Sequence, residues 1–474
     1  MPSPRRLPAF LSWTTPAVWL LLALALGAAA LVWSRPPATH KGLSLWVFAQ
    51  PHRIAYVSVI KKWNEEQANP AHRAECLLID FPALERRLLS GLLSGTPVGE
   101  LVEVERAVAA RTFTGPLEDI GFYDLTDRLK AEGLMDAINP PSFAPWISRG
   151  RIFGIPHDVH PILLVYRSDL TDAAGIDMSK IETWEEFFTA LRPLMADADH
   201  DGHPDRYLMN FWPSNVVLLE GLLLQAGGGF FDAKEKLVID SEVNARVLSS
   251  LATWCGGPGR VALDVPDFNA AGNALRLRGT VVAALMPDWL GGRWRLDMPE
   301  LAGKLRLMPL PAWERGGLRT TTYGGTMLGI PKATKDFEAA WRFAKRLYLD
   351  PETHASFFRT TNIIPPVRTS WTHPAFSEPD PYFGGQLVGQ LYIAQAGNIP
   401  VRTSSPYNNF ALDRVADALL KLVDIAERDQ VRDPAALLES ARAELREAQR
   451  QTARQIERNV FFREDAAHPS PPAP

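Results

Sequence analysis

The chain has 474 residues, 46% of them hydrophobic and 22% charged, so it is long and apolar enough for two globular domains and is neither disordered nor fibrous in composition. The formal net charge is only -4, with acidic and basic residues dispersed along the chain, which argues against a nucleic-acid-binding surface or a polyanionic tail. The two cysteines, Cys76 and Cys255, are far apart and exclude a disulfide framework or a zinc ribbon.

An uncharged apolar run covers residues 17–33 and follows two arginines. At about 1.5 Å per residue it just spans a bilayer. Small residues at Ala28 and Ala30 also fit the cleavage site of a secretory signal. Residues 17–33 are therefore either a transmembrane anchor after a cytoplasmic segment 1–16 or a cleaved signal peptide, with a buried core helix as the third alternative. Both of the first two interpretations export the rest of the chain, and residues 34–42 are predicted to be a linker.

After the linker, strand patterns and helix patterns alternate. Apolar runs over 43–49, 75–81 and 99–105 predict strands, and residues 53–67 and 83–95 between them carry apolar positions at helical spacing. This order predicts right-handed crossovers and a parallel sheet covered by helices, with ligands bound at the carboxyl ends of the strands. Further strands are expected over 161–167, 280–289 and 304–311, and further helices over 183–197, 212–228, 240–255, 336–350, 413–430 and 433–458.

Several stretches are together similar to one family: "LSLWVFAQPHRIAYVSVIKKWNEEQ", "GTPVGELVEVE", "GRIFGIPHDVHPILLVYRSDLTDAAGID", "LMPDWLGG", "TTTYGGTMLGIPKATKDFEAAWRFAKRLYLDPE" and "NIIPPVRTS". In this order and spacing they resemble the extracellular solute-binding proteins of ABC-type sugar importers, the maltose-binding-protein-like group. The resemblance runs from Leu43 to Asn459. One departure is Gly99-Glu100, where members usually carry Pro-Asp before the third strand.

The resemblance implies an α/β fold of the type II periplasmic-binding-protein class. This is a two-lobed clamp in which each lobe is a mostly parallel sheet covered by helices, here with one N-terminal hydrophobic helix in addition. One lobe would hold residues 43–157 and 308–352, and the other 161–305 and 355–460. Such clamps close around a ligand by hinge bending. Residues 461–474 are rich in proline and polar residues and are predicted to be a disordered tail.

The segment "GIPHDVH" (residues 154–160) places two histidines and an aspartate in one turn. A zinc site is disfavoured, because residues three apart in an extended segment face opposite sides and no other His, Cys or carboxylate has a matching spacing. In the clamp this segment is the first crossing between the lobes, with Gly154 and Pro156 shaping the hinge. Cys76 and Cys255 then fall in different lobes and are not expected to pair.

A sugar site combines aromatic planes with carboxylates, amides and arginines, because a sugar has apolar C–H faces and many hydroxyl groups. Trp289 is the strongest candidate, since it stands at a strand end beside Asp288, although tryptophan is also a common core residue. The strand period puts Glu103 and Glu105 on one face, either toward the ligand or at a solvated edge. The resemblance places the following residues at the ligand: Phe48, Gln50, His52, Glu103, Glu105, Asp158, His160, Asp288, Trp289, Tyr323, Gly325 and Tyr407.

A separate acidic segment suggests calcium. Asp197, Asp199 and Asp201, with a glycine next, match the first half of an EF-hand loop, and Asp205 stands where a ninth-position ligand would. The twelfth position is Leu208, where a bidentate glutamate is expected. The segment is therefore either a weak Ca²⁺ site or a simple acidic turn.

The resemblance implies a function in transport. The chain would be the extracytoplasmic, monomeric solute-binding component of an ABC transporter, capturing a carbohydrate or polyol and delivering it to a membrane permease. It is expected not to be an enzyme and to need no cofactor or nucleic acid, and its N-terminal helix would hold it to the membrane. Two alternatives stay open: a membrane-anchored ligand-sensing module, and a carbohydrate-active hydrolase that uses Glu103 or Glu105 with Asp158.

Overall fold

The structure is a computed structural model with two separate units, divided between Gly42 and Leu43. In the first unit, α1 (Pro16–Ser34) is a helix of mostly exposed side chains. Across the ranges that the structure describes, no helix has both the length and the apolar character needed to cross a membrane, which leaves the predicted anchor over 17–33 without support. The predicted tail, 461–474, lies outside the described residues. The described residues are 16–34, 42–195, 197, 200, 204–232 and 235–459.

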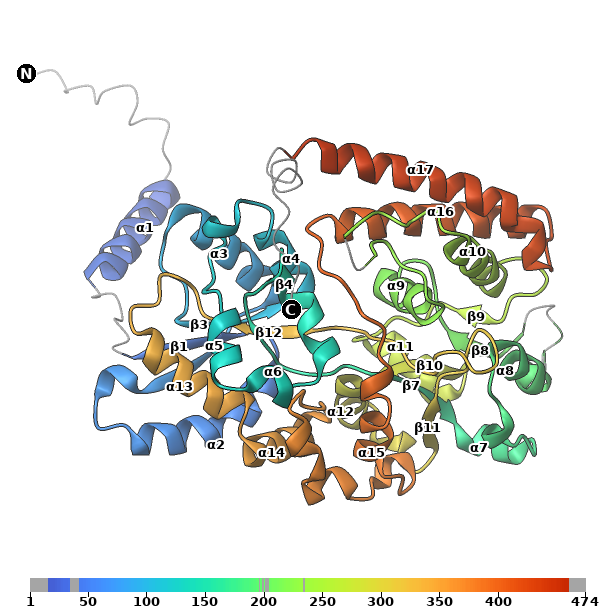
Figure 1. The fold of residues 1–474 in the computed structure, drawn as a ribbon, viewed down its shortest axis with the longest axis horizontal. Helices are drawn as coiled ribbons and strands as arrows, with labels where there is room; N and C mark the ends of the chain where they lie inside the picture. Colours follow the sequence, from blue (N-terminus) through green and yellow to red (C-terminus); the bar gives the residue numbers. More distant parts are fainter. Residues whose placement is uncertain are drawn as a thin grey trace, which may run out of the picture. The chain divides into compact units, whose positions relative to one another are not determined.

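The second unit contains two five-stranded sheets (Figure 1). We call each sheet, with the helices packed on it, a lobe. In the first sheet the order is β2-β1-β3-β12-β6, with β1 parallel to β2 and β3, and with β12 antiparallel to β3 and β6. Its strands are β1 (Leu43–Val47), β2 (Ala74–Leu78), β3 (Leu101–Glu105), β6 (Ile155–Pro156) and β12 (Thr326–Gly329).

Alternation along these strands divides the first lobe into two cores. Leu43, Leu45 and Val47 of β1 lie in the core under α2 and α13, whereas Val102 and Val104 of β3 lie in the core under α3 and α4. The bounds of the helices of this lobe are α2 (Gln50–Glu66), α3 (Phe81–Ser94), α4 (Arg106–Thr112), α5 (Thr126–Ala131), α6 (Leu134–Ala137), α13 (Phe337–Tyr348) and α14 (Pro351–Thr361). A short hairpin of β4 (Ile147–Ser148) and β5 (Arg151–Ile152) precedes β6.

The second sheet has the order β11-β7-β10-β8-β9, in which β7 is antiparallel to β10 and β11. Ile162 and Leu164 of β7 face one core and Leu163 and Val165 face the other. Burial on both faces explains why this strand is an uninterrupted apolar run in the sequence. The strands are β7 (Ile162–Arg167), β8 (Tyr207–Asn210), β9 (Ala262–Leu263), β10 (Val281–Pro287) and β11 (Leu305–Pro309).

Helices cover both faces of the second sheet, and the C-terminal pair α16 and α17 packs on α10 (Figure 1). Thr183 forms a capping box with Glu186 at the start of α8, where the sequence predicts the helix to begin. The bounds of the helices of this lobe are α7 (Ser168–Ala173), α8 (Trp184–Leu191), α9 (Val216–Gln225), α10 (Glu242–Cys255), α11 (Ala270–Arg278), α12 (Asp288–Asp297), α15 (Val388–Ile393), α16 (Asn408–Arg428) and α17 (Leu438–Glu457).

The chain passes between the sheets at 157–161, from β6 to β7, and returns from β11 to β12. The chain returns to the first lobe later than the predicted boundary at residue 308. β11 stays paired with β7 through Pro309, and Leu310 packs in the core of the second lobe. Thr322 still forms a β-bridge with Pro161. The other predicted lobe boundaries stay predictions. Each sheet is mixed, since β12 and β7 run against their neighbours.

Gly154 is required just before the first crossing. A Cβ atom there would lie 2.3 Å from Sδ and 2.8 Å from Cβ of Met327 on β12. The close approach of the two backbones allows β6 to pair with β12, with Pro156 opposite Met327. The predicted role of Gly154 in shaping this segment thus has a steric basis.

Candidate ligand site at the junction of the lobes

The crossing carries a chain of buried ionisable side chains. Asp158 Oδ2 lies 2.7 Å from His157 Nδ1 and 2.6 Å from His160 Nε2. His160 Nδ1 lies 3.0 Å from Oδ1 of Asp288, the first residue of α12. Asp288 also accepts the backbone N–H of Ile364 at 2.8 Å. The network therefore joins the crossing, the end of strand β10 and the segment after α14.

These contacts make His160 a cation. Burial opposes its charge, but the attraction of Asp158 and Asp288 and their hydrogen bonds prevail and raise the pKa of His160 to about 10. Burial likewise opposes the charge of Asp158, and its two histidine neighbours nevertheless hold its pKa well below the usual range. His160 also has a left-handed backbone, with φ of 53°, which is uncommon for a residue with a side chain. The predicted Asp158, His160 and Asp288 are thus brought together, but as a satisfied ionic network.

Glu103 lies inside the first lobe rather than at its edge. It is fully buried, and its Oε1 accepts hydrogen bonds from the hydroxyl groups of Tyr56 and Tyr348, both at 2.8 Å. Its Oε2 lies 2.7 Å from Nδ1 of His52. Glu103 and His52 therefore face the core under α2 and α13. The expectation that Glu103 and Glu105 point together toward a ligand, or lie at a solvated edge, is wrong for Glu103, because α2 covers this face of β3.

Glu105 ends strand β3 and is half-buried. Its carboxylate accepts the N–H of Ala107 at 2.7 Å and caps α4. Burial raises the pKa of Glu105, and the positive charge of Arg106 only partly offsets that effect. Glu105 stays at the carboxyl end of the strand, where the sequence placed it.

Trp289 lies in an aromatic group at the start of α12. Its ring stacks against Phe268 at 6.0 Å between centroids and meets Tyr323 edge-on at 5.4 Å. Its Nε1 donates to the carbonyl oxygen of Tyr323 at 3.2 Å. Trp289 is partly exposed and Phe268 is 57% exposed, so this group is not a closed core. Trp289 and Tyr323 were predicted together, whereas Phe268 was missed.

A second ionic group links the two lobes. Glu220 of α9, in the second lobe, accepts hydrogen bonds from Arg106 Nη2 at 3.1 Å and from Asn408 Nδ2 at 2.9 Å. Arg402 forms an ion pair with the same carboxylate and donates to the carbonyl oxygen of Gly324 at 3.1 Å. Arg106 follows β3 in the first lobe, so this carboxylate connects the end of that strand to the second lobe.

All three charged groups of this junction are 2–4% exposed. Burial favours neutral Glu220, but Arg106 and Arg402 lower its pKa to about 2. The buried Arg106 Nε and Nη1, Arg402 Nε and Ser404 Oγ have no hydrogen-bond partner in the described part of the chain. Buried polar atoms normally have one. The junction therefore presents unused hydrogen-bonding groups next to the Tyr323–Gly324 backbone on which Trp289 rests.

These junction residues were missed from the sequence. A detectable pattern was present for Glu220, which is the one charged residue in the apolar helix "VVLLEGLLLQ". A carboxylate in such a run must be paired when buried. Nothing local marks Arg106 or Arg402, because their roles depend on contacts 114 and 182 residues away.

The remaining predicted residues separate into two groups. Gly325 lies at the junction, where its carbonyl oxygen accepts the N–H of Arg106 at 3.0 Å and its φ of 122° excludes most side chains. Phe48 packs on Phe81 at 5.3 Å at the ends of β1 and β2. Gln50 is exposed at the first turn of α2. Tyr407 belongs to the second lobe's core and is 8% exposed, so it does not join the aromatic group.

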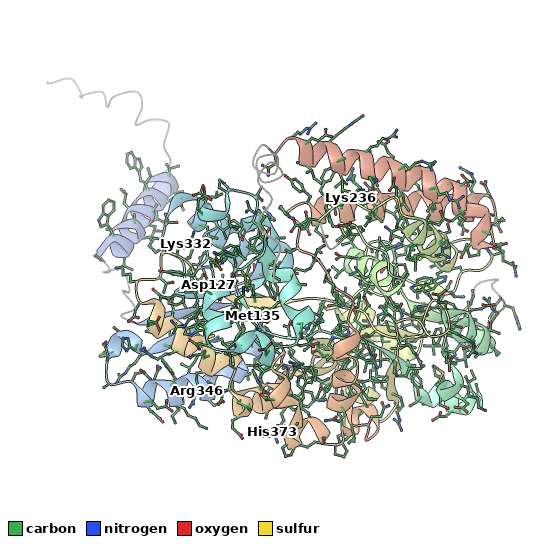
Figure 2. All side chains as sticks on the ribbon, viewed as in Figure 1. Asp127, Met135, Lys236, Lys332, Arg346 and His373 are labelled. Atoms are coloured by element: carbon green, nitrogen blue, oxygen red, sulfur yellow. The ribbon has the colours of Figure 1, made fainter. Side chains whose placement is uncertain are left out.

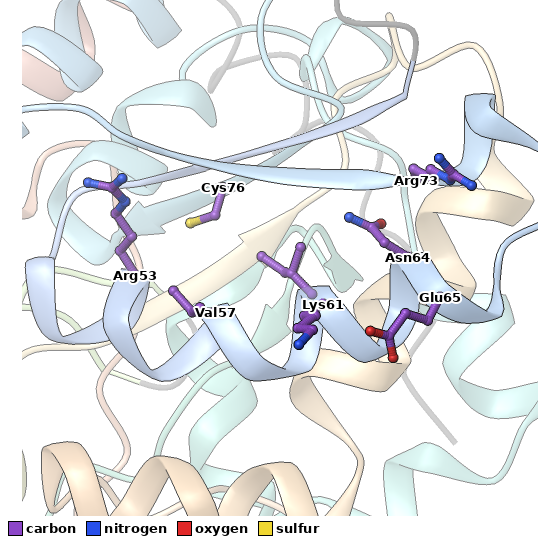
Figure 3. Close-up of a pocket in the computed structure, with 8 residues that line it drawn as sticks. Arg53, Val57, Lys61, Asn64, Glu65, Arg73 and Cys76 are labelled. Carbon is purple, nitrogen blue, oxygen red and sulfur yellow. The ribbon is translucent and has the colours of Figure 1, made fainter.

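A pocket elsewhere on the first lobe lies between α2 and β2 (Figure 3). Arg53, Val57 and Lys61 line it from the helix and Cys76 from the strand. Burial raises the pKa of the Cys76 thiol to about 12, so the thiol stays protonated. Cys76 and Cys255 are both free, as expected. Ionic contacts such as that of Arg346 Nη2 with Glu66 Oε1, at 3.1 Å, lie on the outside of this lobe (Figure 2).

The predicted calcium segment is only partly described. Asp199 and Asp201 lie outside the described residues, while Asp197 and Asp205 are within them. Calcium binding there stays a prediction.

Comparison with known proteins identifies the class. A family model described as bacterial extracellular solute-binding protein matches residues 79–352, more than half of the chain. The chain belongs to this family. It is 25% identical to the arabinooligosaccharide-binding protein of Halalkalibacterium halodurans over 392 residues, covering 80% of this chain and 84% of that protein. It is also 25% identical to the lactose-binding protein of Rhizobium radiobacter over 351 residues, covering 70% and 77%.

Solved structures show the same fold. The sugar-binding protein MalE of Xanthomonas citri aligns with a TM-score of 0.66 at 17% identity, covering 88% of this chain and 99% of that one. The galacto-N-biose-/lacto-N-biose I-binding protein of Bifidobacterium longum aligns with a TM-score of 0.66 at 16% identity, again covering 88% and 99%. The predicted α/β fold of this class is confirmed.

Proposed function

We propose that this chain is the solute-binding component of an ABC importer and captures a carbohydrate between its two lobes. Relatives that are 25% identical to this chain bind arabinooligosaccharides or lactose, according to their names. The observation that carries the proposal for this chain is the junction itself. There, the unpartnered polar atoms of Arg106 and Arg402 belong to side chains beside the Tyr323–Gly325 backbone, which the partly exposed ring of Trp289 also contacts. Hydrogen-bonding groups and an aromatic face are what a hydroxyl-rich ring requires.

The ion pair of Arg106 with Glu220 suggests how capture is coupled to movement. It joins the start of α4, directly after β3 of one lobe, to α9 of the other. A ligand that enters the junction would hydrogen-bond to these groups and exchange one set of contacts between the lobes for another. The crossing at 157–161, held by His160 between Asp158 and Asp288, would be the hinge around which the lobes move.

The test is a binding screen with the exported part of the chain, using arabinooligosaccharides, lactose, maltooligosaccharides and polyols. We expect a saturable rise in melting temperature with one class of oligosaccharide, confirmed by calorimetry, and an unchanged ligand on chromatography afterwards. Trp289→Ala should abolish most of the rise, whereas Trp212→Ala, which removes a tryptophan packed over Arg260 at 5.2 Å, should not. Absence of any carbohydrate binding across the panel would refute the proposal, and release of shorter sugars would favour a hydrolase.

The hydrolase alternative required Glu103 or Glu105 with Asp158. Glu103 is engaged by two tyrosines and His52, and Asp158 by two histidines. These contacts favour binding over acid–base chemistry. We further propose that the protein acts outside the cytoplasm as a monomer, that residues 17–33 direct its export, and that a membrane permease receives the ligand.

A further inference from the structure

The first lobe contains a cluster of metal-ligating side chains that carbohydrate capture does not use. His52 of α2, Glu103 of β3 and His157 of the crossing each offer one ligand atom, and these atoms lie within 4.8 Å of one another. The three residues are 6%, 0% and 7% exposed. We propose that this cluster is a binding site for a divalent transition metal, with Zn²⁺ as the best match.

The type and order of the donors support zinc. Two imidazoles and one carboxylate form a common zinc ligand set that leaves a fourth position open. Hard cations such as Mg²⁺ and Ca²⁺ prefer sites made entirely of oxygen atoms, so the two histidines select against them. The rings of His52 and His157 are neighbours, with centroids 4.6 Å apart in a stacked arrangement, and one ring would turn so that both rings point a nitrogen at the ion.

Neighbouring groups hold each donor in an orientation suited to a metal. The hydroxyl groups of Tyr56 and Tyr348 both donate to Glu103 Oε1, which leaves Oε2 directed at His52. Asp158 Oδ2 lies 2.7 Å from His157 Nδ1, which leaves Nε2 for the metal. A carboxylate on the far nitrogen of a ligating histidine is the usual outer partner in zinc sites. In the metal-bound state the ion would replace the proton shared by His52 Nδ1 and Glu103 Oε2.

An unpartnered histidine gives an independent indication of a missing ligand. Nε2 of His354 is buried and has no hydrogen-bond partner among the described residues, while its Nδ1 lies 2.8 Å from Ser370 Oγ. His354 and His157 line the same small cavity, together with Tyr56 and Tyr348. We assign His354 to the site as the partner of a water molecule beside His157 that completes the coordination.

The proposal goes beyond carbohydrate binding and connects to the hinge. His157 binds Asp158, which binds His160, which in turn contacts Asp288 beside Trp289. An ion on His157 would therefore add a fixed charge at one end of the chain of contacts that leads to the junction. Occupancy of the metal site and the carbohydrate screen are nevertheless measured separately, so failure of one does not decide the other.

The experiment uses the purified protein, which is stripped of metal with a chelator and then titrated with Zn²⁺ against a chromophoric competitor. Co²⁺ is added in parallel, because a cobalt ion bound by nitrogen and oxygen ligands in a four-coordinate site absorbs visible light strongly. We expect one equivalent of each ion to bind. His157→Gln and Glu103→Gln should weaken Zn²⁺ binding at least tenfold, and His354→Gln and Tyr348→Phe should weaken it about tenfold. His72→Gln, at a partly exposed imidazole 3.1 Å from Asp336, is the matched control and should not change it.

The folding of each variant is checked by its circular dichroism and by metal-free melting. No saturable binding of Zn²⁺ to the unmodified chain would overturn the proposal and leave the cluster as a buried hydrogen-bond network. Binding that is unchanged in folded His157→Gln would also overturn it. If His157→Gln does not fold, Tyr348→Phe decides, because it removes only one hydroxyl group. Unchanged affinity and an unchanged cobalt spectrum in that variant would contradict the assignment.

Discussion

His160→Gln tests whether the ionic network at the crossing stabilises the folded protein. The side chain lies between two buried carboxylates, with Nε2 2.6 Å from Asp158 and Nδ1 3.0 Å from Asp288. These contacts raise the pKa of His160 from 6.5 to about 10 against the opposing effect of burial. Glutamine retains an amide group that can donate hydrogen bonds but not the charge, so both carboxylates lose their shared cation.

The expected magnitude follows from proton linkage. A histidine with a raised pKa in the folded state contributes stability that is fully present below its unfolded pKa and disappears as the pH rises through its folded pKa. With about 1.4 kcal/mol for each unit between the two values, the contribution is about 4.5 kcal/mol at pH 6 and about 1.5 kcal/mol at pH 9. The lower-pH value agrees with the roughly 3–5 kcal/mol that breaking a buried ion pair costs.

The assay is urea denaturation of the unmodified chain and of His160→Gln between pH 6 and pH 9. We expect the difference in unfolding free energy to shrink by about 3 kcal/mol across this range. His72→Gln, at an exposed ion pair, should differ from the unmodified chain by only a few tenths of a kcal/mol at every pH. A large but pH-independent effect of His160→Gln would show that the loss arises from packing and would refute the electrostatic reasoning.

Four further changes test other parts of the structure. Glu220→Gln should lower the unfolding free energy by about 3 kcal/mol at pH 7, because the pKa of Glu220 is held at about 2 in the folded protein. This contribution is present above pH 4.5 and is lost as the pH falls through 2. An equal effect of the substitution at pH 2 and at pH 7 in chemical denaturation would contradict the prediction. Gly154→Ala should destabilise by about 1–3 kcal/mol through its clash with Met327, whereas Gly115→Ala, with open space around it, should be nearly neutral in the same melting assay. Trp289→Ala should weaken carbohydrate binding at least tenfold, or about 1.4 kcal/mol, with little change in the melting temperature without ligand; calorimetry showing unchanged affinity would remove it from the site. Calorimetry with millimolar Ca²⁺ decides between the two interpretations of the segment 197–205: weak saturable binding would show a Ca²⁺ site, and a flat trace a simple acidic turn.

Local patterns predicted the elements of this protein well. The alternating strand and helix patterns over 43–105 correspond to β1, α2, β2, α3 and β3. They could be predicted because the burial pattern of a strand and the amphipathic pattern of a helix both repeat within a few residues. The start of α8 at Thr183 and the position of Trp289 just after β10 were predicted from the same local patterns. The return from β11 to β12 was misplaced, because an apolar strand does not reveal which of two sheets it joins.

The site was predicted less completely, since its chemistry depends on contacts between distant segments. His157 was judged a poor metal ligand because no partner had a suitable spacing, yet Glu103 and His52 reach it from two other elements. Glu103 was assigned to the ligand because the strand period gives a face but not what covers that face. The pairing of Arg106 with Glu220 joins the two lobes, and no periodicity within either segment encodes it.

The place of β12 in the first sheet has a consequence for how the protein is made. Thr326–Gly329 is the last strand in chain order, yet it lies between β3 and β6, and β6 has no other strand neighbour in the sheet. A growing chain therefore cannot complete its N-terminal lobe until the whole second sheet has been synthesised. Pairings over such sequence separations form slowly. A polypeptide destined to cross a membrane unfolded would benefit from this delay, since its first lobe cannot reach its final structure before Gly329 of the 474 residues has been made.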